Sequence, residues 1–131
     1  METQRLAQLL SKEKRRSDRL GLPIKISYCL PKENKWEGPL YVINASGGGI
    51  RFITNKNIEE NTELDIKIII PKESRNPISL KGTVVWCRKK YPNSKDYYVG
   101  VKFHKMQDDD RRRYVVYLCE NILLHNLKNQ N

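Results

Sequence analysis

The sequence is poor in the residues that hold metals or form disulfides. It has only three cysteines and two histidines. Cys29, Cys87 and Cys119 lie far apart and form no Cys-x-x-Cys pair, so neither a zinc site nor a disulfide framework is expected. We expect three reduced thiols, buried in strands or in a helix.

Long apolar segments are also absent. The longest purely aliphatic stretches, such as residues 68–70, fall far short of the ~20 residues that span a bilayer. Residues 1–10 are polar and lack the apolar core of a signal peptide, so a cytoplasmic location is expected. With 131 residues, of which 38% are hydrophobic, the chain is expected to form one folded domain rather than a disordered or membrane protein.

Acidic residues are too few to balance the basic ones. Twenty-five Lys and Arg stand against 15 Asp and Glu, which gives a formal net charge of +10. Such a surface favours an anionic partner: nucleic acid, an anionic membrane surface or a phosphorylated small ligand.

The spacing of apolar residues predicts six strands and two helices. Alternating residues predict strands over Ile24–Leu30, Leu40–Ile43, Ile50–Ile53, Leu64–Ile70, Ser79–Lys89 and Tyr97–Phe103. Repeats of three to four residues predict a short helix over Met1–Glu13 and a helix over Asp108–Asn126, with residues 127–131 fraying. Six short strands and one terminal helix suggest a β-barrel or a β-sandwich with a helix packed against it.

No catalytic constellation is visible, so an enzyme is not expected. His104 and His125 are paired with no plausible nucleophile and are interpreted as surface residues. The acidic run Asp108–Asp110 lacks the spacing of a calcium loop and is interpreted as favourable charge at a helix N-terminus. Neither a metal nor a cofactor is expected.

Two motifs indicate ligand binding. Arg15-x-x-x-Arg19 places two guanidinium groups in a basic segment before a strand, where they can grip phosphate oxygens or contact guanine. Asn44-x-Ser46-x-x-Gly49 offers an amide and a hydroxyl at a turn between strands, where glycines let a ligand approach the backbone.

With these two motifs, the sequence resembles the PilZ domain family, bacterial receptors for cyclic di-GMP. The similar segments are RRSDR (15–19), NASGGG (44–49) and YYVGVKF (97–103), and the resemblance covers about residues 13–120. It implies a mainly β fold, a six-stranded antiparallel β-barrel with a C-terminal helix. In this interpretation residues 1–12 form an N-terminal helix or arm, residues 13–126 form the domain, and residues 127–131 form a disordered tail.

The resemblance also implies a ligand and a set of ligand-binding residues. Arg15 and Arg19 would hold phosphates and contact guanine, and Arg16 would add a phosphate contact. Asn44, Ser46 and Gly49 would contact the other guanine face from the barrel surface. The implied function is a cyclic di-GMP receptor whose basic arm wraps the ligand, and whose N-terminal helix then signals to a protein partner.

Two alternatives accompany this interpretation. A general nucleic-acid-binding β-barrel would explain the positive charge, but Tyr97 and Tyr98 are adjacent and point to opposite faces, so no stacking ladder is formed. A PilZ module that binds only protein is the other alternative.

Trp86 is expected in the core, Trp36 is a possible partner contact in a loop, and Arg111–Arg113 are expected to form a solvated helix face.

Overall fold

The structure is a computed structural model, and it describes residues 24–71 and 76–129. Within helix α3, the side chains beyond residue 121 are not described. The predicted helix over residues 1–13, the basic residues Arg15, Arg16 and Arg19, and the His125 side chain therefore lie outside the described residues.

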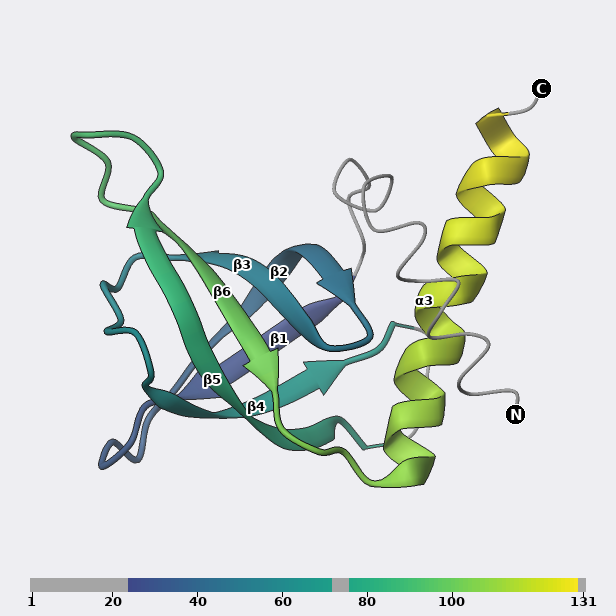
Figure 1. Ribbon diagram of the computed structural model, residues 1–131, viewed down its shortest axis with the longest axis horizontal. Coiled ribbons are helices and arrows are strands. Elements are labelled where there is room, and N and C mark those ends of the chain that lie inside the picture. Colours follow the sequence, from purple (N-terminus) through teal and green to yellow (C-terminus); the bar gives the residue numbers. More distant parts are fainter. Residues whose placement is uncertain (1–23, 72–75, 130–131) are drawn as a thin grey trace.

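The described chain forms a closed β-barrel followed by one helix (Figure 1). Neighbouring strands pair antiparallel in the order β1-β2-β3-β6-β5-β4, and β4 pairs with β1 to close the barrel. This confirms the barrel and excludes the sandwich. The elements are β1 (Lys25–Cys29), β2 (Trp36–Ser46), β3 (Gly49–Thr54), β4 (Glu63–Ile69), β5 (Ile78–Lys89), β6 (Tyr97–Phe103) and α3 (Asp108–Asn129).

Alternation along the strands places branched apolar side chains inside the barrel. Ile66 and Ile68 on β4 are buried, whereas Asp65, the residue before Ile66, is exposed. The core also contains Ile24, Ile26, Tyr28, Val42, Ile50, Phe52, Leu64, Ile78, Val84, Val99 and Val101. Because each strand in the described part of the chain pairs with a neighbour on both sides, the barrel has no edge strand.

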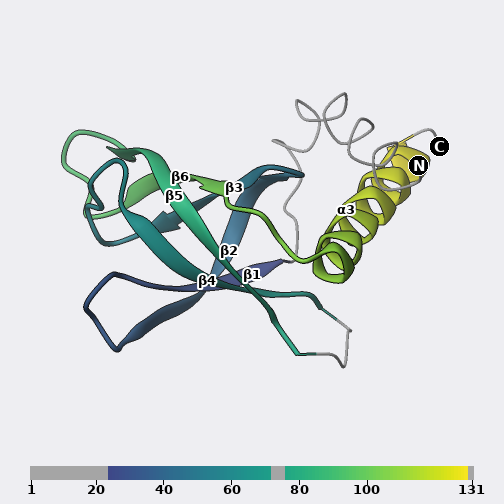
Figure 2. The ribbon, with the colours of Figure 1, turned by 60° about the horizontal axis from the view of Figure 1, so that its bottom comes forward.

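Helix α3 lies beside one end of the barrel, and the loop between β5 and β6 lies at the other end (Figures 1 and 2). Three aspartates occupy the first turn of α3, where the helix dipole favours negative charge. Tyr114, Val115 and Leu118 are buried, and the Tyr114 ring meets Phe103 of β6 edge-to-face at 5.5 Å. The helix extends to Asn129, three residues beyond its predicted end.

Two sequence predictions about strands are wrong. Strand β2 begins at Trp36, so the residues before Leu40 are not all loop. Trp86 is not a core residue: it is half-buried on the outer face of the barrel. A bulge between Val84 and Trp86 shifts the alternation of β5, so Val84 points into the core and Trp86 points outward.

The three cysteines are free. Cys29 and Cys119 are buried, as expected, whereas Cys87 on β5 is half-buried. In the part of the chain that the structure describes, no helix is long and apolar enough to cross a membrane.

Candidate functional site

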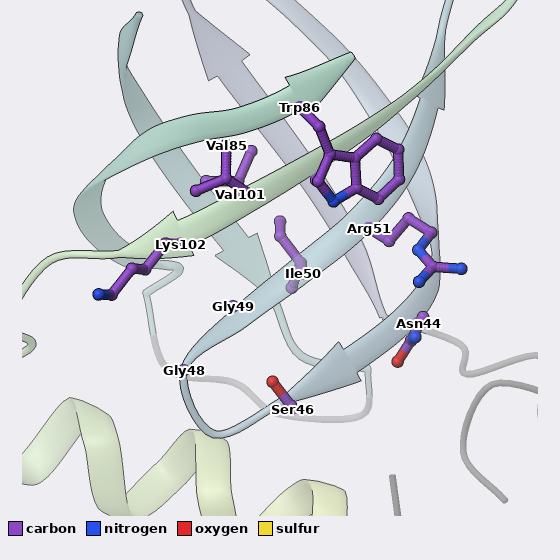
Figure 3. A pocket seen from close by; sticks show the side chains of 11 residues that line it. Asn44, Ser46, Gly48, Gly49, Ile50, Arg51, Val85, Trp86, Val101 and Lys102 are labelled. Atoms are coloured by element: carbon purple, nitrogen blue, oxygen red, sulfur yellow. The ribbon is translucent and has the colours of Figure 1, made fainter. Parts of the chain in front are cut away.

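The second motif forms the turn between β2 and β3. Asn44 pairs with Arg51, and Ser46 pairs with Gly49, which leaves Gly47 and Gly48 as the two turn residues. Ala45, between the two polar residues, is buried inside the barrel. Asn44 and Ser46 therefore lie on the face opposite Ala45 (Figure 3). On that face Ser46 is half-buried, and Asn44 is buried with 7% of its surface exposed.

Gly49 has a packing role of its own. A Cβ atom at Gly49 would overlap the carbonyl oxygen of Val101 on the paired strand β6. A Cβ atom at Gly48 would meet nothing within 4 Å. The motif glycine at position 49 is thus required by the close approach of two strands, whatever else it contacts.

Strand β6 and helix α3 both hold this turn. The Phe103 N–H donates to the Gly48 carbonyl at 2.8 Å. The Tyr114 hydroxyl donates to the Ser46 carbonyl at 2.7 Å, and the Arg111 guanidinium lies 3.5 Å from the Gly47 carbonyl. Burial raises the pKa of Tyr114 far above its usual range, so the hydroxyl keeps its proton and remains a donor.

These contacts correct the expectation of a solvated arginine face on α3. Arg111 contacts the turn, and Arg113 donates to the carbonyl of Asn76 at 2.8 Å and pairs with Asp110 at 3.3 Å. Of the three arginines, Arg112 is exposed, and Arg111 and Arg113 are half-buried. The helix is therefore fastened to the motif through its first two turns.

Replacing Tyr114 by phenylalanine is expected to lower the free energy of unfolding by about 1–3 kcal/mol, because the Ser46 carbonyl loses its buried donor. Denaturant unfolding measures this change. Tyr41→Phe removes a hydroxyl from a side chain that is 64% exposed and is the matched control, with no measurable loss expected. Equal unfolding midpoints for the two variants would contradict this role of Tyr114.

The motif borders a surface cavity of about 270 Å³ (Figure 3). Its walls combine an amide, a hydroxyl, two cationic side chains and one indole ring. The lining residues are Asn44, Ser46, Gly48, Gly49, Ile50, Arg51, Val85, Trp86, Gly100, Val101 and Lys102.

Trp86 forms one wall of this cavity because its neighbour across the strand pair is a glycine. Trp86 pairs with Gly100, and a Cβ atom at Gly100 would overlap the indole ring. Arg51 on β3 and Arg88 on β5 place their guanidinium carbons 5.3 and 5.1 Å from the ring centroid. The indole thus packs against Gly100 of β6, with two guanidinium groups close to its ring.

The structure brings together three of the six predicted site residues. Asn44, Ser46 and Gly49 line one cavity, whereas Arg15, Arg16 and Arg19 lie outside the described residues. Sequence reasoning missed Arg51, Trp86 and Lys102. Arg51 could have been found by alternation, because it lies two residues after Gly49 on the same face of β3.

The cavity is suited to an anionic ligand that carries planar rings. Arg51 and Lys102 supply positive charge for phosphate oxygens, and Trp86 supplies an apolar wall for a heterocycle. The Asn44 amide can both donate and accept. Among the described residues, no group of three or more His, Cys, Asp or Glu side chains is placed to hold a metal ion.

Comparisons with known proteins agree with this fold. A family model described as the PilZ domain matches residues 13–120. A comparison with curated proteins finds no match.

Several solved structures have the same fold. The inhibitor of motility MotI/DgrA of Bacillus subtilis aligns with a TM-score of 0.63 and 16% identity, over 81% of this chain and 49% of that one. MrkH of K. pneumonia, in complex with c-di-GMP, aligns with a TM-score of 0.65 and 19% identity, over 84% of this chain and 52% of that one. PlzA of Borreliella burgdorferi, also in complex with c-di-GMP, aligns with a TM-score of 0.56 and 12% identity, over 98% of this chain and 59% of that one. The chain thus spans about half the length of these proteins.

Proposed function

Because this chain belongs to the PilZ domain family, we propose that it is a receptor for cyclic di-GMP. The observation that carries the proposal is the meeting of Asn44, Ser46 and Gly49 with Arg51 and Trp86 in one cavity. Two proteins of the same fold, MrkH and PlzA, were solved as c-di-GMP complexes, which supports the choice of ligand. The proposed function is binding, with no chemical step.

The chemistry of the cavity matches the groups of a cyclic dinucleotide. The ligand carries two phosphates and two guanines, so it needs cations, flat contact surfaces and hydrogen-bond partners at the base edges. We assign the guanine contact to Asn44 and Ser46 and the stacking wall to Trp86. Arg51 and Lys102 add positive charge near the phosphates.

The basic motif is assigned to the same ligand. Ile24 is the first described residue, and its carbonyl accepts a hydrogen bond from the N–H of Val42, two residues before Asn44. The five peptide links from Ile24 back to Arg19 reach at most about 17 Å. Arg19 can therefore reach a ligand in the cavity, and Arg15 and Arg16 have a longer tether.

The proposed mechanism is a clamp. The segment that carries Arg15, Arg16 and Arg19 closes over the ligand, and the phosphates supply charge-assisted hydrogen bonds. The ordering of this segment changes the position of the N-terminal arm, residues 1–12, and a protein partner reads that change. The partner is defined only as a protein that distinguishes the two arm positions.

The two tryptophans of the chain allow a direct test of ligand position. Trp86 lines the cavity, whereas Trp36 lies on β2 with the Lys67 ammonium 4.3 Å from its ring centroid. Cyclic di-GMP is expected to change the tryptophan fluorescence because a guanine stacks near Trp86. Titration of the Trp36→Phe variant should retain the change, and titration of the Trp86→Phe variant should lose it.

The reverse pattern would place the ligand elsewhere on the barrel. Calorimetric titration of both variants is the control, because it distinguishes a ligand that binds without changing the fluorescence from a ligand that does not bind. The proposed site would be contradicted if both variants bound cyclic di-GMP with unchanged affinity and only Trp36→Phe removed the fluorescence change.

A further inference from the structure

The loop that joins β5 and β6 carries a dense group of cations that the proposed cyclic di-GMP site does not use. The hairpin tip, defined here as residues 89–95, contains Lys89, Lys90 and Lys95, all exposed. Arg88, at the end of β5, is exposed as well. The tip lies at the end of the barrel away from α3 (Figures 1 and 2).

Hydrogen bonds fix the shape of this tip. The Lys90 N–H donates to the Asp96 carbonyl at 3.0 Å, which closes the hairpin. The Ser94 N–H donates to the Tyr91 carbonyl at 2.9 Å, and the buried Ser94 hydroxyl accepts from the Asp96 N–H at 3.0 Å. The lysines are thus presented from an ordered turn.

Tyr91 stands at the tip among these lysines, and 59% of its surface is exposed. An exposed aromatic ring, flanked in the sequence by exposed lysines on a projecting loop, matches the interface of an anionic bilayer. There, an amphipathic ring sits at the headgroup level and ammonium groups meet the lipid phosphates.

Acidic residues of neighbouring elements lie at the root of the hairpin. Glu59 and Glu60 belong to the connection between β3 and β4, which is held against β5 by a hydrogen bond from the Asn61 N–H to the Val84 carbonyl at 2.7 Å. Asp96 borders a second cavity, together with Glu37. Residues 89–95 themselves contain no acidic side chain.

We propose that the hairpin tip docks the protein on an anionic phospholipid surface. The shape of the tip favours a bilayer over single-stranded nucleic acid, which is bound along grooves with open aromatic platforms. The nearest aromatic ring on β5, Trp86, lines the cavity at the β2–β3 turn and is not part of the tip. Docking through the tip does not cover α3 or the cavity at the β2–β3 turn, so both stay accessible to a ligand or a partner. The proposal does not depend on cyclic di-GMP binding.

Flotation of the full chain with sealed vesicles tests the proposal. The protein is expected to float with vesicles of phosphatidylcholine and phosphatidylglycerol, and not with phosphatidylcholine alone. The Lys89→Gln/Lys90→Gln variant should lower the partition coefficient about thirtyfold, because two cations leave the membrane contact. Tyr91→Ser should lower it several-fold.

The matched control is the Lys81→Gln/Lys105→Gln variant, which loses the same charge from exposed positions outside the hairpin. This variant should float nearly as well as the natural sequence, and all variants should share its unfolding midpoint. Equal losses for the two double variants would assign binding to net charge alone and overturn the proposal. Absence of flotation, or binding of a single-stranded oligonucleotide through Lys89 and Lys90 without flotation, would also overturn it.

Discussion

Replacing Arg19 by alanine is expected to weaken cyclic di-GMP binding by about tenfold to a hundredfold. Each hydrogen bond between a guanidinium and a phosphate contributes about 1.5–3 kcal/mol, and alanine at position 19 removes the bonds that Arg19 makes. Isothermal titration calorimetry of the purified variant measures the loss. The fold should be unchanged, because Arg19 precedes the first strand of the barrel.

Arg5→Ala is the matched control, since it removes the same charge from a position outside the Arg-x-x-x-Arg motif. A specific receptor loses affinity in Arg19→Ala and keeps it in Arg5→Ala. If both variants lose affinity equally, the ligand is attracted by net charge and the clamp is wrong.

Replacing Gly49 by alanine is expected to lower the free energy of unfolding by about 1–3 kcal/mol. The added methyl group overlaps the Val101 carbonyl oxygen, which is backbone and cannot turn aside. The strands β3 and β6 must separate where they pair, beside the turn that carries Ser46. Denaturant unfolding, followed by circular dichroism, measures the loss.

Gly48→Ala is a strict control because the two glycines are adjacent in the turn. Its new methyl group meets no atom within 4 Å, so the free energy of unfolding should change by less than about 0.5 kcal/mol. Similar losses for Gly48→Ala and Gly49→Ala would mean that turn flexibility, not the contact with Val101, explains the glycine at position 49.

Strand periodicity predicted most of the fold. In the run from Leu64 to Ile70, every second residue is Leu64, Ile66, Ile68 or Ile70, and the structure buries all four in the core. Alternation could not decide between a barrel and a sandwich, because both bury one face of each strand. The pairing of β1 with β4 distinguishes them, and that pairing depends on strand order, which no local pattern contains.

A β-bulge explains why the sequence prediction placed Trp86 in the core. A strict period of two assigns Val84 and Trp86 to the same face, and burial of large aromatic rings then favours the core. The bulge between them reverses that assignment, and the glycine at position 100 provides the flat surface on which the indole lies. Neither the bulge nor the partner strand is visible in the residues around Trp86.

The sequence motifs identified part of the site, but not the residues from β6 and α3 that hold the turn or line its cavity. Asn44, Ser46 and Gly49 share a short segment and could be recognised together. Tyr114 and Lys102 are far away in sequence and reach the turn or its cavity only through tertiary packing. Their roles depend on how α3 and β6 sit against the β2–β3 turn.

The most direct test of the account is calorimetric titration of the full chain with cyclic di-GMP at moderate salt, with GTP as the control ligand. The account predicts saturable binding of cyclic di-GMP, micromolar or tighter, and no binding of GTP. The absence of heat with cyclic di-GMP, or equal binding of GTP, would contradict the receptor function. The barrel would then be assigned to a PilZ module that binds protein or nucleic acid without this ligand.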